Sequence, residues 1–257
     1  MQGFNHRLGQ YLDVSGAKIY YEIVGNHSAP VLLFLHGGLG TMECFNKIIA
    51  DFAQDFKIIG IDNRGHGKST LGSEELSYEL LQQEVESVLA HLKIDELSVV
   101  GFSNGGTIAY RLASLTSLKI KKLVTIGSPW RPMRDKNSRE NYSKLTVDIW
   151  KELCPSDYET YQTLNPERNL ELCFPLMKKM ALDTSEKSHP NQRVKNIKSS
   201  MLITRGEHDP VFSHEDMLEL ADMVNDARVF TIPGIGHEAV PGEPALFAEK
   251  LKEFFTE

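Results

Sequence analysis

The sequence of 257 residues predicts an α/β fold built around a mainly parallel β-sheet. Short apolar runs rich in β-branched residues recur along the chain, and most are followed by loop residues and then by a stretch of helical periodicity. Five or six of these runs are continuously apolar, as expected for strands that helices cover on both faces. One segment without a convincing strand, 129–198, breaks the alternation.

The expected strands are seven apolar runs bounded by loop residues. They lie at 18–24, 31–35, 56–62, 97–100, 122–126, 200–204 and 228–232. Two other stretches, 76–92 and 246–255, carry apolar residues at helical spacing and are expected to form amphipathic helices.

The segment 129–198 is too long for an ordinary crossover connection between two strands. It contains helical pieces such as 143–153 and 170–182, so we interpret it as a helical lid inserted into a core domain formed by 1–128 and 199–257. The alternative is an irregular surface excursion. The prolines expected to interrupt the helical pieces are Pro155, Pro166, Pro175 and Pro190.

Composition narrows the function classes. The net charge of −7, with no stretch that concentrates Lys and Arg, argues against nucleic acid as a partner. Three cysteines without a C-x-x-C pair suggest free thiols in a reducing compartment. The chain has no 18-residue apolar run and its first residues form no apolar signal region, so we expect a cytoplasmic protein without a membrane span. The oligomeric state stays open between monomer and homodimer.

The stretch GFSNGG (101–106) places a serine between glycines, after an apolar run and before a helical period. In that context the serine sits on a sharp turn that lifts its hydroxyl clear of the sheet, and the glycines permit close backbone approach. We therefore interpret Ser103 as a nucleophile. A serine hydroxyl is a weak nucleophile near neutral pH, so it requires a base and a carboxylate that orients the base.

His237 and Asp209 are the expected partners of Ser103. Each follows an expected strand, and the carboxyl ends of parallel strands meet at one edge of the sheet. The rival base is His208. The rival acids are Asp183, within the expected lid, and Glu207.

These motifs, in this order, resemble the α/β-hydrolase superfamily. Besides GFSNGG, the resemblance rests on LHGGLG (35–40), DNRGHGKS (62–69), and the pair RGEHDP (205–210) and GIGHEAV (234–240). Within the superfamily the chain is similar to small lidded esterases, enol-lactonases and biphenyl-hydrolase-like enzymes. The resemblance implies an eight-stranded sheet whose first two strands are antiparallel or mixed, with a lid after the sixth strand.

The resemblance implies that Ser103 is the nucleophile, His237 the general base and acid, and Asp209 its orienter. The oxyanion that forms on acyl transfer needs hydrogen-bond donors. We expect one to be the backbone N–H of Asn104, at a helix N-terminus. The second is expected to be Gly38, with Leu39 as the near alternative.

Four other residues of these motifs are expected to brace loops: His36, Asp62, Arg64 and His66. Cys44 follows the HGGLG loop closely and is expected to be a buried inert thiol, with an approach to the pocket as the alternative. The pocket is expected to be largely apolar. Its candidate lining residues, each of which could instead pack the lid onto the sheet, are Leu39, Trp130, Met133, Trp150, Phe174, Met177 and Val240.

No cofactor or metal is expected. The stretch GHGKS (65–69) ends like a phosphate-binding loop, but Asp62 stands where that motif needs glycine. The dinucleotide pattern fails because Glu43 occupies the place of its third glycine. No cluster of His, Cys and carboxylates has zinc-like spacing.

The leading hypothesis is hydrolysis of a carboxylic ester, thioester or lactone of a small to medium, largely apolar substrate through a Ser103 acyl-enzyme. The nearest rival is a carbon–carbon bond hydrolase or an aminopeptidase or amidase with the same triad. A hydrolase-fold receptor that binds a ligand with little turnover is a second alternative, and a nucleotide-binding protein is a distant one.

Overall fold

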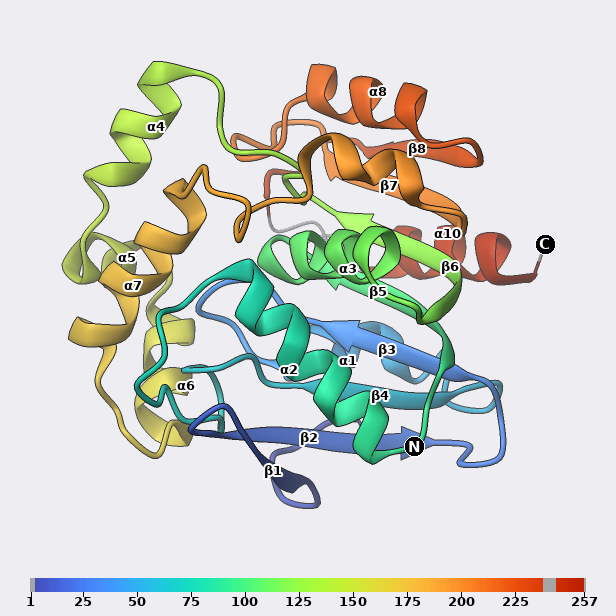
Figure 1. Cartoon of the computed structure of the whole chain (residues 1–257), viewed down its shortest axis with the longest axis horizontal. Helices are drawn as coiled ribbons and strands as arrows, with labels where there is room; N and C mark the ends of the chain where they lie inside the picture. The colour runs from blue at the N-terminus through green and yellow to red at the C-terminus, as the bar shows by residue number, and fades with distance from the viewer. Residues whose placement is uncertain (1–2, 238–243, 257) are drawn as a thin grey trace.

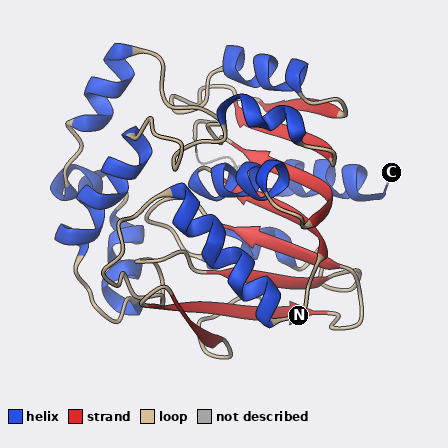
Figure 2. Ribbon diagram, in the orientation of Figure 1, coloured by secondary structure: helices blue, strands red, loops and turns tan. Residues whose placement is uncertain are grey.

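The computed structural model describes residues 3–237 and 244–256, which form one eight-stranded sheet with helices on both faces (Figures 1 and 2). The spatial order of the strands is β1-β2-β4-β3-β5-β6-β7-β8. β2 is antiparallel to both of its neighbours, and all pairs from β4–β3 to β7–β8 are parallel. The strands are β1 (Gln10–Val14), β2 (Ala17–Gly25), β3 (Val31–Leu35), β4 (Lys57–Ile61), β5 (Glu96–Phe102), β6 (Lys119–Ile126), β7 (Ser200–Gly206) and β8 (Ala227–Ile232).

The expected α/β fold is confirmed, and each of the seven expected runs forms a strand. The additional strand, β1, was not among them because it is a half-exposed edge strand whose sequence, QYLDV, mixes polar and apolar residues. The continuous apolar runs are explained by the two sides of the sheet. Leu33 and Leu35 of β3 belong to one hydrophobic cluster, whereas Leu32 and Phe34 belong to the other.

Helices from separate parts of the chain cover the two faces. α2 (Tyr78–His91) and α3 (Asn104–Leu115) lie in front of the sheet in Figure 1, while α1 (Asn46–Ile49) and α10 (Pro244–Thr256) lie behind it. α8 (His214–Met223) joins the cluster of α2 and α3 through its buried residues. α2 begins where the Ser77 hydroxyl accepts the N–H of Leu80, which supplies a side-chain cap.

The segment 129–198 forms helices and no strand, and all of it is described. Its helices α4 (Lys136–Ser143), α5 (Val147–Leu153), α6 (Pro155–Leu164) and α7 (Leu170–Leu182) gather at one end of the sheet (Figure 1). The short 3₁₀ helix η2 (Asn191–Asn196) follows them and packs against α3. Another 3₁₀ helix, η1 (Met42–Phe45), belongs to the core, between β3 and β4.

The expectation that four prolines interrupt these helices is wrong for Pro175, which lies inside α7. Pro175 lacks the N–H that would bond to the carbonyl of Glu171. Both residues are exposed, so water can satisfy that carbonyl and the helix continues. Pro155 begins α6, where the missing N–H has no helical partner in any case.

Gly105 sits where α3 begins and packs directly on the end of β3. A Cβ atom at this position would lie 2.0 Å from the backbone oxygen of Leu35, closer than any real contact. We expect Gly105→Ala to lower the free energy of unfolding by about 2 to 3 kcal/mol, because backbone must move to make room. Urea unfolding measures the change.

Gly40→Ala is the matched control, since its Cβ would meet nothing closer than 3.5 Å. A loss below about 1 kcal/mol is expected there. Equal losses for the two variants would contradict this packing account of Gly105.

Candidate active site

Ser103 occupies the turn between β5 and α3 with a backbone that L-residues rarely adopt, φ 52° and ψ −119°. The turn is held by a hydrogen bond from the Ser103 N–H to the Ile126 oxygen at 2.8 Å. Glycines crowd around it: a Cβ on Gly101 would lie 2.6 Å from the backbone of Gly105, and one on Gly106 would lie 1.9 Å from Ser128 Oγ. Such strain persists only where the surrounding packing enforces it.

Ser103, His237 and Asp209 form one hydrogen-bonded chain. His237 Nε2 lies 2.9 Å from Ser103 Oγ, and His237 Nδ1 lies 3.0 Å from Asp209 Oδ2. An ionised carboxylate only accepts hydrogen bonds, so Nδ1 carries the proton and Nε2 accepts from the serine hydroxyl. The three residues come from the loops after β5, β7 and β8, all at the carboxyl edge of the sheet.

The Asp209 carboxylate is fixed by its own loop and by a glycine. Its Oδ1 accepts the N–H groups of Val211, at 2.7 Å, and Phe212, at 3.1 Å. Gly127, with φ 56°, presses against the same group, since a Cβ there would lie 2.6 Å from Asp209 Oδ2. Asp209 is therefore held in place before any substrate binds.

The rival acids and base are not part of this chain. Glu207 accepts the N–H of Gly234, and Asp183 accepts from Ser185 within the inserted segment. The side chain of His208 is 70% exposed, and its Nε2 lies 3.9 Å from Glu207 Oε2.

The loop after β3 lies directly over the serine turn. A Cβ on Gly37 would lie 3.1 Å from Ser103 Cβ, and one on Gly38 would lie 2.7 Å from Asn104 Nδ2. Only glycines permit this approach. Leu39 follows with φ 61°, a backbone conformation that L-residues rarely adopt.

His36 braces this loop as a neutral imidazole. Its Nε2 accepts the N–H of Asn63 at 2.9 Å, so its Nδ1 carries a proton and donates to the Gly37 oxygen at 2.7 Å. Burial lowers the pKa of His36 and keeps the ring uncharged. His66 likewise donates through Nδ1 to the backbone oxygen of Arg64, so both histidines stabilise loops through hydrogen bonds to the backbone.

Asp62 connects the loops around the site. It accepts the N–H groups of Met42, at 3.2 Å, and Lys68, at 2.9 Å, and it pairs with His6 Nε2 at 2.8 Å. His6 Nδ1 in turn lies 2.6 Å from Glu43 Oε1. Sequence reasoning did not identify His6, because nothing near it in the chain marks its contact with residues some forty to sixty positions away.

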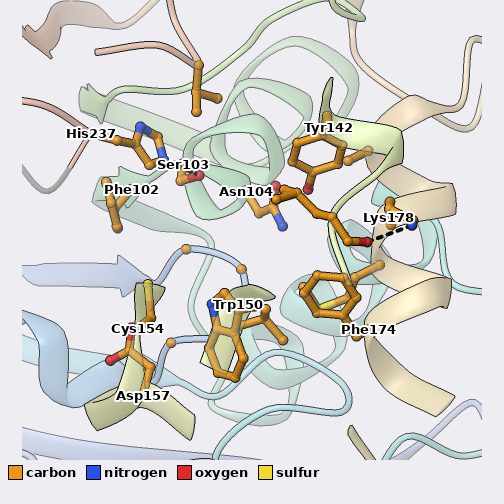
Figure 3. Close-up of a pocket in the computed structure, with 18 of the residues that line it drawn as sticks. Phe102, Ser103, Asn104, Tyr142, Trp150, Cys154, Asp157, Phe174, Lys178 and His237 are labelled. Carbon is orange, nitrogen blue, oxygen red and sulfur yellow. Dashed lines mark hydrogen bonds between the residues drawn. The ribbon is translucent and has the colours of Figure 1, made fainter. Parts of the chain in front are cut away.

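A cavity of about 540 Å³ opens above Ser103, between the sheet edge and the inserted helices (Figure 3). Of the candidate lining residues, Leu39, Met133, Trp150, Phe174 and Met177 border it. Trp130 does not. Its ring is buried elsewhere, donates from Nε1 to the Asp216 oxygen at 3.0 Å and lies under the Arg131 guanidinium. Val240 falls outside the described residues.

Polar residues of the cavity wall were not anticipated. Lys178 donates from Nζ to the carbonyl oxygens of Ser143 and Leu145 (Figure 3). These hydrogen bonds connect α7 to the end of α4 and the residues that follow it. Tyr78 donates its hydroxyl to Asn104 Oδ1 at 2.7 Å. Other unanticipated members of the wall are Glu43, Tyr142, Cys154, Asp157 and His189, and Cys44 also borders it. These residues are scattered along the sequence without a shared motif, so the sequence alone does not indicate that they meet at the cavity.

Within residues 3–237 and 244–256, no group of three His, Cys, Asp or Glu side chains could hold a metal ion. In the same part of the chain, no helix has the length and apolarity needed to cross a membrane.

Residues 30–147 match the family model described as the alpha/beta hydrolase fold. A protein of Haemophilus influenzae provisionally named an esterase/lipase is 23% identical over 251 residues, which cover 92% of this chain and 87% of that protein. Among solved structures, the enol-lactonase from Burkholderia xenovorans has a TM-score of 0.72 at 19% identity, covering 96% of this chain and 100% of the other. The meta-cleavage product hydrolase from Pseudomonas fluorescens has a TM-score of 0.78 at 20% identity, covering 98% and 99%.

The sheet order, the serine turn at its carboxyl edge and these likenesses define a hydrolase fold. Residues 30–147 match the family model, and the α/β-hydrolase fold that the motifs predict is confirmed. At identities of 19% and 20%, the likeness to the two solved structures establishes the fold alone.

The His6 contacts predict a pH-dependent stability. Burial opposes the charged imidazolium, but the bonds to Asp62 and Glu43 outweigh it and raise the pKa of His6 from 6.5 to about 9. The contribution of His6 to the stability of the folded protein is thus complete below pH 6.5 and is lost as the pH rises through 9. We expect His6→Gln to lower the free energy of unfolding by about 2 to 3 kcal/mol at pH 6 and by much less at pH 9.5.

Denaturant unfolding across this range measures the difference. The exposed His27 provides the control, because His27→Gln should leave stability nearly unchanged at every pH. A His6→Gln penalty that stayed constant from pH 6 to 9.5 would contradict a charged His6.

Proposed function

We propose that the protein is a serine hydrolase that cleaves a carboxylic ester, thioester or lactone of a small to medium, largely apolar substrate. The observation that carries the proposal is the hydrogen-bonded chain Ser103–His237–Asp209, whose serine opens into the cavity. The esterase/lipase and enol-lactonase names of similar proteins support the same reaction class.

In the first half of the proposed reaction, Ser103 Oγ attacks the substrate carbonyl carbon while its proton passes to His237 Nε2. Asp209 stabilises the imidazolium that forms. The tetrahedral intermediate then collapses, the bond to the leaving group breaks, and His237 returns the proton to the departing oxygen or sulfur. The second half repeats these steps with water, which gives up a proton to His237, forms the carboxylic acid and frees Ser103.

Two backbone N–H groups are proposed to stabilise the oxyanion. Asn104 is the first residue of α3, so its N–H is free of helical bonds and lies where the helix dipole favours negative charge. Gly38 is the proposed second donor because it packs against Asn104, with Leu39 as the alternative. Each such donor contributes about 3 to 4 kcal/mol of transition-state stabilisation.

The inserted segment 129–198 is proposed to act as a lid. Met133, Trp150, Phe174 and Met177 all come from it and border the cavity. An apolar cover of this kind limits the access of bulk water to the acyl-enzyme until the lid opens. The three free cysteines favour a reducing compartment, so we propose the cytoplasm as the location.

A carbon–carbon bond hydrolase with the same three residues is the second candidate, favoured by the likeness to the meta-cleavage product hydrolase. p-Nitrophenyl esters of increasing chain length separate the two candidates. Steady ester turnover supports the first, whereas cleavage of a vinylogous diketone without ester turnover would establish the second.

Removal of the proposed nucleophile or base should abolish the reaction. We expect Ser103→Ala and His237→Ala to lose labelling by a fluorophosphonate and to lower kcat on an ester substrate by at least about 10⁴-fold. Asp209→Asn should lower kcat by a similar order while the fold is retained. Labelling of the Ser103→Ala variant at the wild-type rate would refute the assignment of the nucleophile.

Charge beside the oxyanion should slow the reaction. Asn104→Asp keeps the acceptor for the Tyr78 hydroxyl but replaces the neutral amide, close to Gly38, with a carboxylate. We expect kcat/KM to fall about 10- to 100-fold, because a negative charge repels the developing oxyanion. Asn104→Ala, which preserves the backbone N–H, is the neutral control and should lose less than about 10-fold. Equal losses for both variants would exclude the charge effect.

A further inference from the structure

His189 is a buried histidine that the proposed reaction does not use. It precedes η2, where the inserted segment returns towards the sheet, and its side chain borders the cavity although the residue is only 2% exposed. Its ring meets Tyr78 of α2 edge-on, with ring centroids 4.9 Å apart. The two rings therefore form one stretch of the cavity wall, contributed by the core and by the insertion.

The hydrogen bonds around His189 fix its tautomer. Ser188 Oγ donates its single proton to the Asp183 oxygen at 2.6 Å. The same Oγ lies 2.8 Å from His189 Nδ1, so it must accept there and Nδ1 must carry the proton. Burial and the nearby charge of Arg111 lower the pKa of His189 to about 3. The imidazole is thus neutral, with an unprotonated Nε2.

This Nε2 acceptor has no hydrogen-bond partner among the residues that the structure describes. His189 is one of the residues that line the cavity. Because its Nδ1 is bonded to Ser188, Nε2 is the ring nitrogen that remains for a ligand there. An unpaired acceptor in the wall of a largely apolar cavity is suited to a donor on the ligand.

Asn104 supplies a complementary group in the same wall. Because the Tyr78 hydroxyl donates to Asn104 Oδ1, the Asn104 amide turns its Nδ2 donor towards Gly38 and the cavity. Figure 3 shows the Asn104 side chain beside Ser103, on the side of Tyr142. Tyr78 therefore organises a donor, Asn104 Nδ2, and an acceptor, His189 Nε2, on the same side of the cavity.

The acceptor selects among ligand groups. A carboxylate has no proton to offer to His189 Nε2. An ammonium group offers only donors, so it cannot also accept from a donor such as Asn104 Nδ2. An uncharged hydroxyl can donate to His189, and it also offers a lone pair to a donor such as Asn104 Nδ2.

We propose that this wall is a hydroxyl-recognition subsite, and that the substrate is a hydroxylated ester, thioester or lactone whose hydroxyl donates to His189 Nε2. The inference rests on the proposed function for the reaction itself, but the subsite is a binding property and can be measured without turnover. Tyr78 acts as a positioning residue, since its contacts orient both His189 and Asn104.

The test measures binding to the full chain carrying Ser103→Ala, so that no ester is consumed. Calorimetry compares p-nitrophenyl hexanoate with its 3-hydroxy and 6-hydroxy derivatives, and propyl butyrate with 3-hydroxypropyl butyrate. At least one hydroxylated ester should bind about 3- to 10-fold more tightly than its unsubstituted partner, as one neutral hydrogen bond permits. Addition of His189→Phe, which preserves an aromatic edge against Tyr78, should reduce this preference to below 2-fold.

His189→Gln, whose amide oxygen can still accept, should retain at least half of the preference. Absence of any hydroxyl preference in the Ser103→Ala protein would overturn the subsite even if His189→Phe failed to fold. A preference that survived His189→Phe unchanged would also overturn it. Turnover by the wild-type protein is measured separately, so a hydroxyl preference without ester hydrolysis would refute the proposed function and leave the subsite standing.

Discussion

The strained backbone of Ser103 is the constraint on which the rest of the site depends. A φ of 52° is unfavourable for a serine, and here it is enforced by the bond to Ile126 and by backbones that approach as closely as glycine permits. The turn ends β5, begins α3 and directs Ser103 Oγ towards His237. One local geometry therefore supplies both a presented hydroxyl and an N-terminal backbone N–H beside it.

Histidines with defined protonation surround this turn. His36 and His189 are buried and neutral, and each has one nitrogen committed to a neighbour in the protein. His6, by contrast, lies between two carboxylates and stays charged below about pH 9. His237 differs from all three because both of its nitrogens belong to the chain between Asp209 and Ser103. Burial and hydrogen-bond partners thus give these four histidines different environments.

The sheet and the positions of Ser103, Asp209 and His237 could be predicted because they depend on local patterns: apolar runs, glycines beside a serine, and side chains after strands. The edge strand β1 was missed because an exposed strand lacks such a run. Trp130 was placed in the pocket on residue type alone, whereas its position depends on a hydrogen bond to α8. The wall formed by Tyr78, Asn104 and His189 joins three separate elements, so no spacing in the sequence could reveal it. The continuity of α7 through Pro175 likewise depends on its exposed position in the fold.

The proposed reaction depends on the acylation of Ser103. Rapid mixing of the wild-type protein with a p-nitrophenyl ester, followed by acid quench and intact-mass and peptide analysis, tests this directly. We expect a burst of one p-nitrophenol per chain, with the mass of one acyl group on the peptide that contains Ser103. An acyl group on another residue, such as Cys44 in the same cavity, would refute acylation of Ser103. Turnover of an ester whose deacylation is slow, with neither a burst nor an acyl adduct, would refute it as well.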